Sequence, residues 1–395
     1  MLLVMMKKIL LLFIAFILSF STCKATENEE VILEFTDTDT YVADIEEENI
    51  VKEKTLKEKI RDIYSLEIEH TDRPAFLLSE ILTKKYDEKS IMESTHLWGA
   101  YSANLGLNFA ENESFNGNYS YDYINIGLDG KLKNNNADFR IMLNYNPLSN
   151  RNFAQNLFSD MYIATNKITH NRTWLGNTRP RVGMEGGYSP FLLPFVSRAQ
   201  ISRNYGTVRR LGARLSGDYR LVDYDLGIYS SDTYWQSFFP GTEFIGWVNF
   251  KPLGMTDGKY GELTIGSGVQ TGKRTCNYTV AGAYVGYKYK KWWANFEWAD
   301  ADGYNGPSGN SVNTKSSGYY STLAYSISPK LQALVRYDQF DPNKQVARNN
   351  KREYVAGINY FIKGQAVKMM LNYVYCENKA AKNSHRIVLG TQILL

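Results

Sequence analysis

Apolar and polar side chains alternate with a period of two along most of the chain from residue 96 onward. Phe139 and Ile141, for example, flank Arg140 in this way. A period of two is typical of a β-strand that has one apolar and one polar face. Sixteen such segments are predicted, at 96–109, 119–130, 137–145, 158–165, 179–187, 206–217, 219–229, 243–250, 260–269, 277–289, 291–300, 317–327, 330–338, 351–362, 365–376 and 385–395.

The predicted connections between these segments alternate between short turns and long loops. The short turns are expected at Gly217-Asp218, Lys290-Lys291, Ser328-Pro329 and Lys363-Gly364, and the long loops near 110–118, 146–157, 188–205, 230–242, 301–316 and 339–350. Outer-membrane barrels sort their connections in this way, with short turns on the periplasmic side. The connection 166–178 is the one exception, because it is longer than the short turns expected on the periplasmic side. The pattern predicts an all-β fold, a transmembrane antiparallel β-barrel of about sixteen strands over residues 96–395.

The first 25 residues have the features of a cleaved signal peptide. Lys7 and Lys8 precede an apolar run at 9–20 that is too short to span a membrane, and cleavage after Ala25 fits the small-residue rule. No other apolar stretch approaches the ~20 residues of a spanning helix. A membrane protein without such helices must be a closed barrel, because lipid leaves no other partner for backbone polar groups. The expected location is therefore the cell outer membrane.

Residues 26–95 differ in charge from the rest of the chain. They contain nine Lys or Arg against twenty Asp or Glu, a balance of −11, whereas residues 96–395 contain thirty-three against twenty-one, a balance of +12. This difference in charge indicates two regions that are solvated differently. Residues 26–95 are therefore predicted to form an acidic periplasmic segment that precedes the barrel.

This acidic segment is expected to begin disordered and to become helical. The stretch 27–48 is acidic and has too little apolar surface to fold alone. Leu56, Ile60 and Ile63 then recur at helical spacing, in a short helix or two to three turns of coiled coil. A solvated stalk, a trimerisation module and a wall-binding module are alternative interpretations of the segment.

Composition argues against catalysis and against metal or cofactor binding. Beyond the predicted signal peptide only Cys276 and Cys376 remain, on distant segments, and the four histidines are scattered. These counts exclude a disulfide scaffold and argue against metal clusters and histidine-based catalysis. The stretch GSGVQTGKR lacks the Ser or Thr that a phosphate-binding loop requires after its Lys. We expect no enzyme, no cofactor and no nucleic-acid partner, and the 14% aromatic content suits the two interfacial girdles of a barrel.

The last ten residues, RIVLGTQILL, read as a strand up to Leu395. The spacing of Gly390, Ile393 and Leu395 resembles the C-terminal signal by which outer-membrane barrels are inserted. We therefore expect these three residues to direct insertion.

Two central runs resemble a known family, the phosphate-selective porins O and P. They are RVGMEGGYSPFLLPFVSRAQISRN and RRLGARLSGDYRLVDYDLGIYSS, and RYDQFDPN and AVKMMLNYVY near the end are similar too. The resemblance covers most of 96–395 and none of 26–95. It implies a sixteen-stranded, trimeric, anion-preferring diffusion channel whose third long loop, near 188–205, folds into the lumen.

A cluster of arginines supports the implied anion preference. Eight arginines lie between residues 179 and 220, opposed only by Glu185 and Asp218, a balance of +6. Strand alternation places Arg210 and Arg214 on the inward face, and a lipid-facing charge would cost about 2–4 kcal/mol. Rings of Arg select anions, and Arg binds phosphate and carboxylate through two parallel hydrogen bonds. The predicted constriction and anion-binding residues are Arg181, Arg198, Arg203, Arg210 and Arg214.

The sequence therefore predicts an outer-membrane porin for passive diffusion of small hydrophilic solutes, with a preference for anions such as phosphate. Its expected partners are small anionic solutes, outer-membrane lipid and two further copies of the chain. One alternative is that the arginines are ordinary lumen charges, paired with carboxylates to stiffen the wall. Another is a structural tether, in which residues 26–95 bind a periplasmic partner or the cell wall and the pore is incidental.

Overall fold

The structure is a computed structural model that describes residues 76–395, apart from residue 80 and the segments 111–113, 134–136, 146–156, 207–208, 232–238 and 306–310. The predicted signal peptide, the acidic stretch and the stripe at Leu56, Ile60 and Ile63 lie outside the described residues. Among the residues that are described, no helix is both long enough and apolar enough to cross a membrane.

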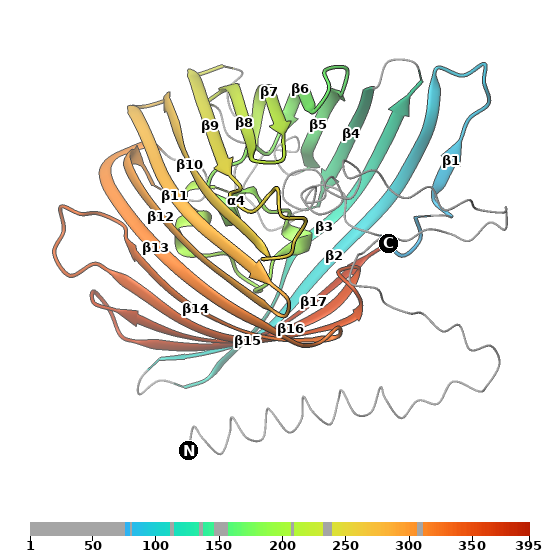
Figure 1. Ribbon diagram of the computed structural model, residues 1–395. Helices are drawn as coiled ribbons and strands as arrows, with labels where there is room; N and C mark the ends of the chain where they lie inside the picture. Colours follow the sequence, from blue (N-terminus) through green and yellow to red (C-terminus); the bar gives the residue numbers. More distant parts are fainter. Residues whose placement is uncertain are drawn as a thin grey trace, which may run out of the picture. The chain divides into compact units, whose positions relative to one another are not determined.

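Sixteen antiparallel strands form a closed barrel, as predicted (Figure 1). The strands are β2 (Met92–Ala110), β3 (Asn116–Leu132), β4 (Ala137–Asn144), β5 (Phe158–Thr165), β6 (Asn171–Thr178), β7 (Arg210–Asp218), β8 (Val222–Ser230), β9 (Thr242–Phe250), β10 (Glu262–Lys273), β11 (Asn277–Tyr289), β12 (Trp292–Tyr304), β13 (Ser311–Ser328), β14 (Leu331–Asp341), β15 (Lys351–Lys363), β16 (Val367–Asn378) and β17 (Ser384–Leu394). Each strand pairs with the next, and β17 pairs with β2 to close the ring. A short strand β1 (Thr83–Lys85) pairs with the start of β2, so the sheet begins within the segment predicted to precede the barrel.

One predicted strand is wrong. The segment 179–187 is not in the sheet, and its place between β5 and β7 is taken by β6. The sequence of β6 is mostly polar, and Gly176 has a φ of 129°, so its alternation is weak. Val182 and Met184 do alternate with polar residues, but both are buried inside the barrel rather than turned to lipid. The long connection noticed at 166–178 was therefore a turn followed by a strand.

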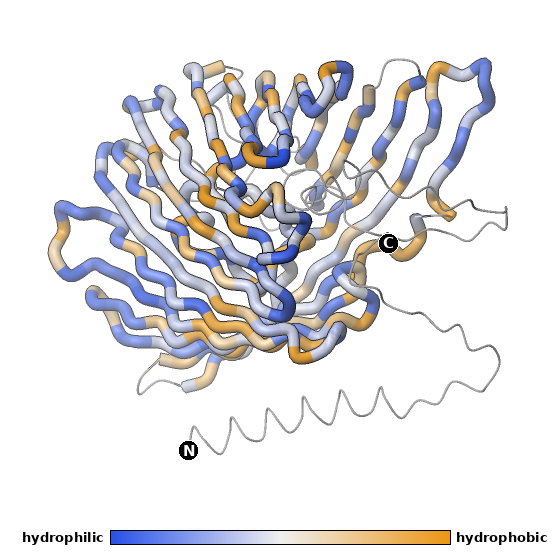
Figure 2. Tube along the Cα trace, in the orientation of Figure 1, coloured by the Kyte–Doolittle hydropathy of each residue, from blue (hydrophilic) through white to orange (hydrophobic). Residues whose placement is uncertain are grey.

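Hydrophilic and hydrophobic residues alternate along the barrel strands (Figure 2), and the two faces of the wall differ in polarity. On β14, for example, Arg336 and Asp338 are buried inside the barrel, whereas Val335, the residue before Arg336, is half exposed on the outside. An outward apolar band and a polar interior are the arrangement that a lipid-embedded barrel requires.

An aromatic row runs across the outer surface at the end of the barrel where the long loops lie. Tyr337, Tyr354, Tyr375, His385 and Phe109 are directly in register on β14, β15, β16, β17 and β2. Neighbouring ring centroids are 5.2, 6.0, 5.0 and 4.8 Å apart. Amphipathic rings of this kind prefer the boundary between lipid and water, so this row marks one edge of the membrane-embedded band.

Candidate functional site

The connection between β6 and β7, residues 179–209, folds into the interior of the barrel (Figure 1). It contains α4 (Met184–Gly187), the 3-10 turn η1 (Pro190–Leu192) and α5 (Gln200–Tyr205). The hydroxyl of Ser189 accepts a hydrogen bond from the Phe191 amide, and Pro190 occupies the first position of the turn, where no amide donor is needed. We call this connection the inward loop. It includes 188–205, where sequence analysis placed an inward loop, and extends beyond that range on both sides.

The inward loop packs against one side of the barrel as a small hydrophobic core. Its buried apolar residues are Val182, Met184, Ala199, Ile201 and Tyr205, and they meet Tyr229, Ile245, Trp247, Tyr278, Val280, Tyr284, Ala299, Ala301, Tyr304, Tyr320 and Phe340 on β8 to β14. Wall glycines make room for this contact, since a Cβ at Gly286 would lie 2.6 Å from Met184 Cε. Removing this apolar surface from water fixes the loop to the wall.

Gly183 lets the carboxylate of Glu297 approach the backbone of the inward loop closely. Gly183 has a φ of 73°, and a Cβ there would lie only 1.9 Å from Glu297 Oε1. The close approach lets the amides of Met184 and Glu185 donate to the two Glu297 oxygens at 3.0 and 3.3 Å. Tyr320 donates its hydroxyl to the same carboxylate at 2.7 Å. Three donors therefore satisfy a carboxylate that is buried inside the barrel.

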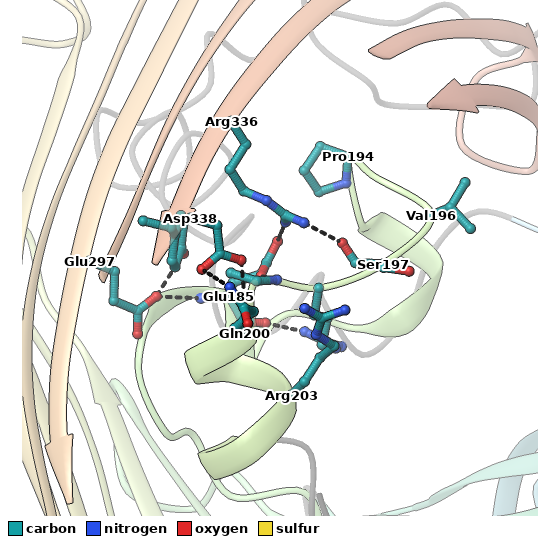
Figure 3. A network of polar contacts seen from close by, with 12 residues as sticks. Glu185, Pro194, Val196, Ser197, Gln200, Arg203, Glu297, Arg336 and Asp338 are labelled. Carbon is teal, nitrogen blue, oxygen red and sulfur yellow. Dashed lines mark hydrogen bonds and ion pairs between the residues drawn. The ribbon is translucent and has the colours of Figure 1, made fainter. Parts of the chain in front are cut away.

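Charged side chains of β14 hold the other face of the loop (Figure 3). Arg336 lies 3.3 Å from Glu185 Oε1 and donates to the carbonyl of Ser197 at 3.0 Å. Asp338 accepts a hydrogen bond from the Gln200 amide at 2.8 Å. The Glu185 and Arg336 side chains are both almost fully buried, so each charge depends on the other.

The tip of the inward loop reaches the opposite side of the barrel. The ammonium of Lys368 on β16 donates to the carbonyls of Phe191 and Leu193 at 3.1 and 3.0 Å, and to Gln365 Oε1 at 2.8 Å. Gln392 on β17 also donates to the Phe191 carbonyl, at 2.9 Å. The loop thus crosses the lumen and is bonded to the wall at both ends of its path.

Four of the five arginines predicted from the sequence form ion pairs. The pairs are Arg181 with Asp223, Arg203 with Glu353, Arg210 with Glu243 and Arg214 with Asp225. As predicted from alternation, Arg210 and Arg214 face inward, where they are 1% and 7% exposed. One carboxylate beside each guanidinium fits the alternative in which lumen arginines stiffen the wall. The role of these residues at a constriction stays a prediction.

Three of these arginines, Arg181, Arg198 and Arg203, lie in the inward loop, and only Arg181 falls in a predicted strand, at 179–187. Arg181 follows β6 and donates to the Tyr284 hydroxyl at 2.6 Å. Arg198 donates to the backbone carbonyls of Glu185 and Tyr188. Burial lowers the pKa of Arg198 to about 10, which leaves its guanidinium charged at neutral pH.

A cleft lies between the tip of the inward loop and the wall formed by the short strands β4 to β7. Its lining residues are Arg140, Met142, Asp160, Tyr162, Thr178, Arg179, Ser189, Pro190, Phe191, Arg209 and Arg214. Four of them are arginines and one is an aspartate, so we call it the arginine cleft. Only Arg214 was among the five arginines predicted from the sequence.

Carboxylates behind and beside the cleft fix its guanidinium groups. Arg140 donates through Nε and Nη2 to the two oxygens of Asp129, at 2.8 and 2.9 Å, and Asp225 holds Arg214 through the same two nitrogens. Arg209 Nε lies 2.5 Å from Asp160 Oδ1. Two-pronged pairs of this kind are strong and set the orientation of the guanidinium plane. Together the four guanidinium groups and these three carboxylates carry a net charge of +1.

Sequence analysis did not select Arg140, Arg179 and Arg209 as site residues. Alternation did separate Arg140 from its outward neighbours, and Arg179 and Arg209 belong to the basic stretch 179–220. What the sequence did not reveal is that these residues meet. Arg179 and Arg209 stand at the two ends of the inward loop, which β6 and β7 bring together by pairing.

The described residues offer little for other chemistry. Within them, no group of three or more His, Cys, Asp or Glu side chains is placed to hold a metal ion. No disulfide joins Cys276 and Cys376.

Comparison with known proteins gives one family and a common fold. The model of the phosphate-selective porin O and P family matches residues 253–394, a segment that contains β10 to β17. No curated protein sequence matches the chain.

Several solved structures are similar to the barrel. An anion-selective porin from Comamonas acidovorans is 11% identical, with a TM-score of 0.54, and the match covers 76% of this chain and 99% of that porin. The trimer form of OmpT from Vibrio cholerae has the same values. OmpF from Salmonella typhi, in complex with daunomycin, is 11% identical with a TM-score of 0.57, and the match covers 76% and 98% of the two chains. At these identities the likeness shows the fold alone.

Proposed function

We propose that this chain is an outer-membrane porin whose channel favours anions over cations, because the model of the phosphate-selective porin O and P family matches residues 253–394 and the barrel is similar to those of solved porins. Small hydrophilic solutes cross it by passive diffusion, and no catalytic step is involved. The observation that carries the proposal is the arginine cleft, where four guanidinium groups border a space beside the inward loop. The anion selectivity of the Comamonas acidovorans porin with a similar barrel is consistent with it.

The physical basis is the field of fixed positive charges in a narrow passage. Arg stays protonated at every physiological pH, so the charge of the cleft does not depend on titration. Low-dielectric walls concentrate that field and raise the local concentration of anions. Salt screens the field over about 8 Å at physiological ionic strength, so selectivity is expected to fall as salt rises.

A planar-bilayer recording of the reversal potential in a KCl gradient tests this proposal. The parent channel should favour chloride over potassium. Changing Arg179 and Arg209 together to Gln should shift the reversal potential toward the cation side, because two positive charges leave the cleft. Arg352→Gln is the control. Arg352 on β15 lies outside the cleft and pairs with Glu377 on β16, and both side chains are partly exposed. A parent channel that favours potassium would overturn the proposal.

We also propose that the chain is exported by a signal peptide at residues 1–25 and assembles as a homotrimer. The trimer form of OmpT, which has a similar fold, is consistent with this assembly. Sequencing the N-terminus of the mature protein should give Thr26 as its first residue. Mild electrophoresis should show a heat-sensitive band of three copies, and a band of one copy under all conditions would exclude the trimer.

A further inference from the structure

We propose that the arginine cleft favours small organic monocarboxylates over inorganic phosphate. The inference rests on the anion preference proposed above and concerns the same site. It follows from three properties of the cleft: its net charge, its apolar side and the geometry of its guanidinium groups.

The charge of the cleft matches one negative charge. Its four arginines are accompanied by Asp160 in the lining and by Asp129 and Asp225 directly behind it, which leaves a net charge of +1. A monocarboxylate neutralises this charge. A phosphate dianion would bring a second negative charge next to Asp160, and a partly desolvated charge without a partner is costly.

Part of the cleft lining is apolar, both on the wall that carries the arginines and at the tip of the inward loop. Met142 projects from β4, and Pro190 and Phe191 form the tip of the inward loop. Hydrogen bonds from Lys368 and Gln392 to the Phe191 carbonyl hold this tip in place. Ligand sites of this type combine an apolar surface with a few fixed polar groups. The hydrocarbon part of an organic acid can contact Met142, Pro190 and Phe191, whereas phosphate has no apolar atoms to place there.

The guanidinium groups of this wall already bind carboxylates. Arg140 and Arg214 each hold an aspartate through two parallel hydrogen bonds, and Arg209 holds Asp160. A planar, two-oxygen anion fits the same fork geometry. Since the protein's own carboxylates occupy part of three of the four guanidinium groups, the donors of the cleft do not surround a tetrahedral anion on all sides.

Block of the chloride current by added anions tests the inference on the full-length channel in planar bilayers. The probes are benzoate, acetate and phosphate as potassium salts, at a mildly alkaline pH where phosphate is mostly the dianion. We expect benzoate to reduce the current at about tenfold lower concentration than acetate, as burial of a ring-sized apolar surface predicts. Phosphate should be the weakest blocker of the three.

Two variants separate the apolar side from the charged side. Met142→Gln keeps the side-chain volume but adds a polar group, so it should abolish the advantage of benzoate over acetate. The paired change of Arg179 and Arg209 to Gln should weaken block by all three anions. Phosphate blocking as strongly as benzoate in a chloride-selective parent overturns this inference and leaves the proposed function standing. A potassium-selective parent would overturn the proposed function itself.

Discussion

Phe76 and Phe191 pack edge to face inside the barrel, with ring centroids 6.4 Å apart. Phe76 also stacks on Trp98 of β2 at 5.1 Å, and the amide of Leu77 donates to the carbonyl of Leu394 at 3.1 Å. The chain that leads into the first barrel strand therefore touches the tip of the inward loop. The segment before the barrel and the loop in the lumen share one apolar cluster.

Phe76→Ala is expected to loosen the tip of the inward loop. The substitution removes the ring contacts with Trp98 and Phe191, and aromatic pairs contribute about 0.5–1.5 kcal/mol beyond their buried area. Single-channel recording should show a larger or noisier conductance. Ile81→Ala is the control, because the Ile81 side chain is 79% exposed and should leave the current unchanged. A Phe76→Ala channel with the conductance and noise of the parent would contradict this coupling.

Arg336→Met is expected to release the inward loop from β14. Removing one member of a buried ion pair costs about 3–5 kcal/mol, because Glu185 is left buried without its counter-charge. The prediction is a higher conductance together with faster proteolysis within residues 179–209. Adding Glu185→Gln should recover part of the lost stability, since the uncompensated charge is then gone.

The control for this experiment is an ion pair of the same type at the surface. Lys315 lies 3.3 Å from Asp302, and both side chains are more than half exposed. Surface pairs contribute about 0–1 kcal/mol, so Lys315→Met should change neither conductance nor proteolysis. Equal effects of Arg336→Met and Lys315→Met would mean that the buried pair does not hold the loop.

The barrel could be predicted from the sequence because its signal is local and repeated. Each strand carries its own alternation, and β11, predicted at 277–289, has those bounds in the structure. Among the sixteen barrel strands, β6 is the one placed wrongly. Leu175 is its single large outward apolar residue, and the rest of the strand is polar or small, apart from the inward Trp174. A strand with a single large outward apolar residue shows no alternation that distinguishes it from a loop.

The candidate site could be predicted only in part because it depends on contacts between distant segments. The basic stretch 179–220 located the inward loop and its arginines. The carboxylates that neutralise them, such as Glu243 and Glu353, come from strands far along the chain, and no local pattern pairs them. Arg140 enters the site only because β4 lies two strands from β6.

Gly390 provides a test of two roles. Sequence analysis assigned it to an insertion signal, but a Cβ at Gly390 would also lie 2.7 Å from Val196 Cγ2 in the inward loop. Gly390→Ala should therefore push the loop and raise the conductance of assembled channels. Adding Val196→Ala removes the clashing methyl group and should restore the parent conductance. A barrel that fails to reach the outer membrane in both variants would assign Gly390 to insertion instead.

Deleting residues 26–75 distinguishes the porin from the tether. The deletion leaves Phe76 and every described residue in place, so the barrel should fold and conduct with the parent selectivity. If the segment binds a periplasmic partner or the cell wall, the outer membrane should detach more easily in cells that carry the deletion. Measuring vesicle release and single-channel conductance on the same variant tests both functions, and unchanged vesicle release would argue against the tether.

Changing Arg210 and Arg214 together to Ser is expected to shift the reversal potential in a KCl gradient toward the cation side. Both arginines face inward, and their loss leaves the carboxylates of Glu243 and Asp225 without counter-charges. The shift should decrease at high salt, because mobile ions in the lumen screen the field of the unpaired carboxylates. The paired change of Lys379 and Lys382 to Ser, in the connection between β16 and β17, should have much less effect.

Adding Glu243→Gln and Asp225→Asn to the Arg210 and Arg214 variant decides how the two arginines act. If they act only as partners of these carboxylates, removing both members of each pair keeps the charge balance and should restore the parent reversal potential. If they attract anions themselves, the four-residue variant should stay less anion-selective than the parent. Because these two arginines are almost fully buried in ion pairs, we expect restoration, with the anion preference carried by the other three arginines of the cleft, Arg140, Arg179 and Arg209. A four-residue variant that stays shifted would place Arg210 and Arg214 at the constriction.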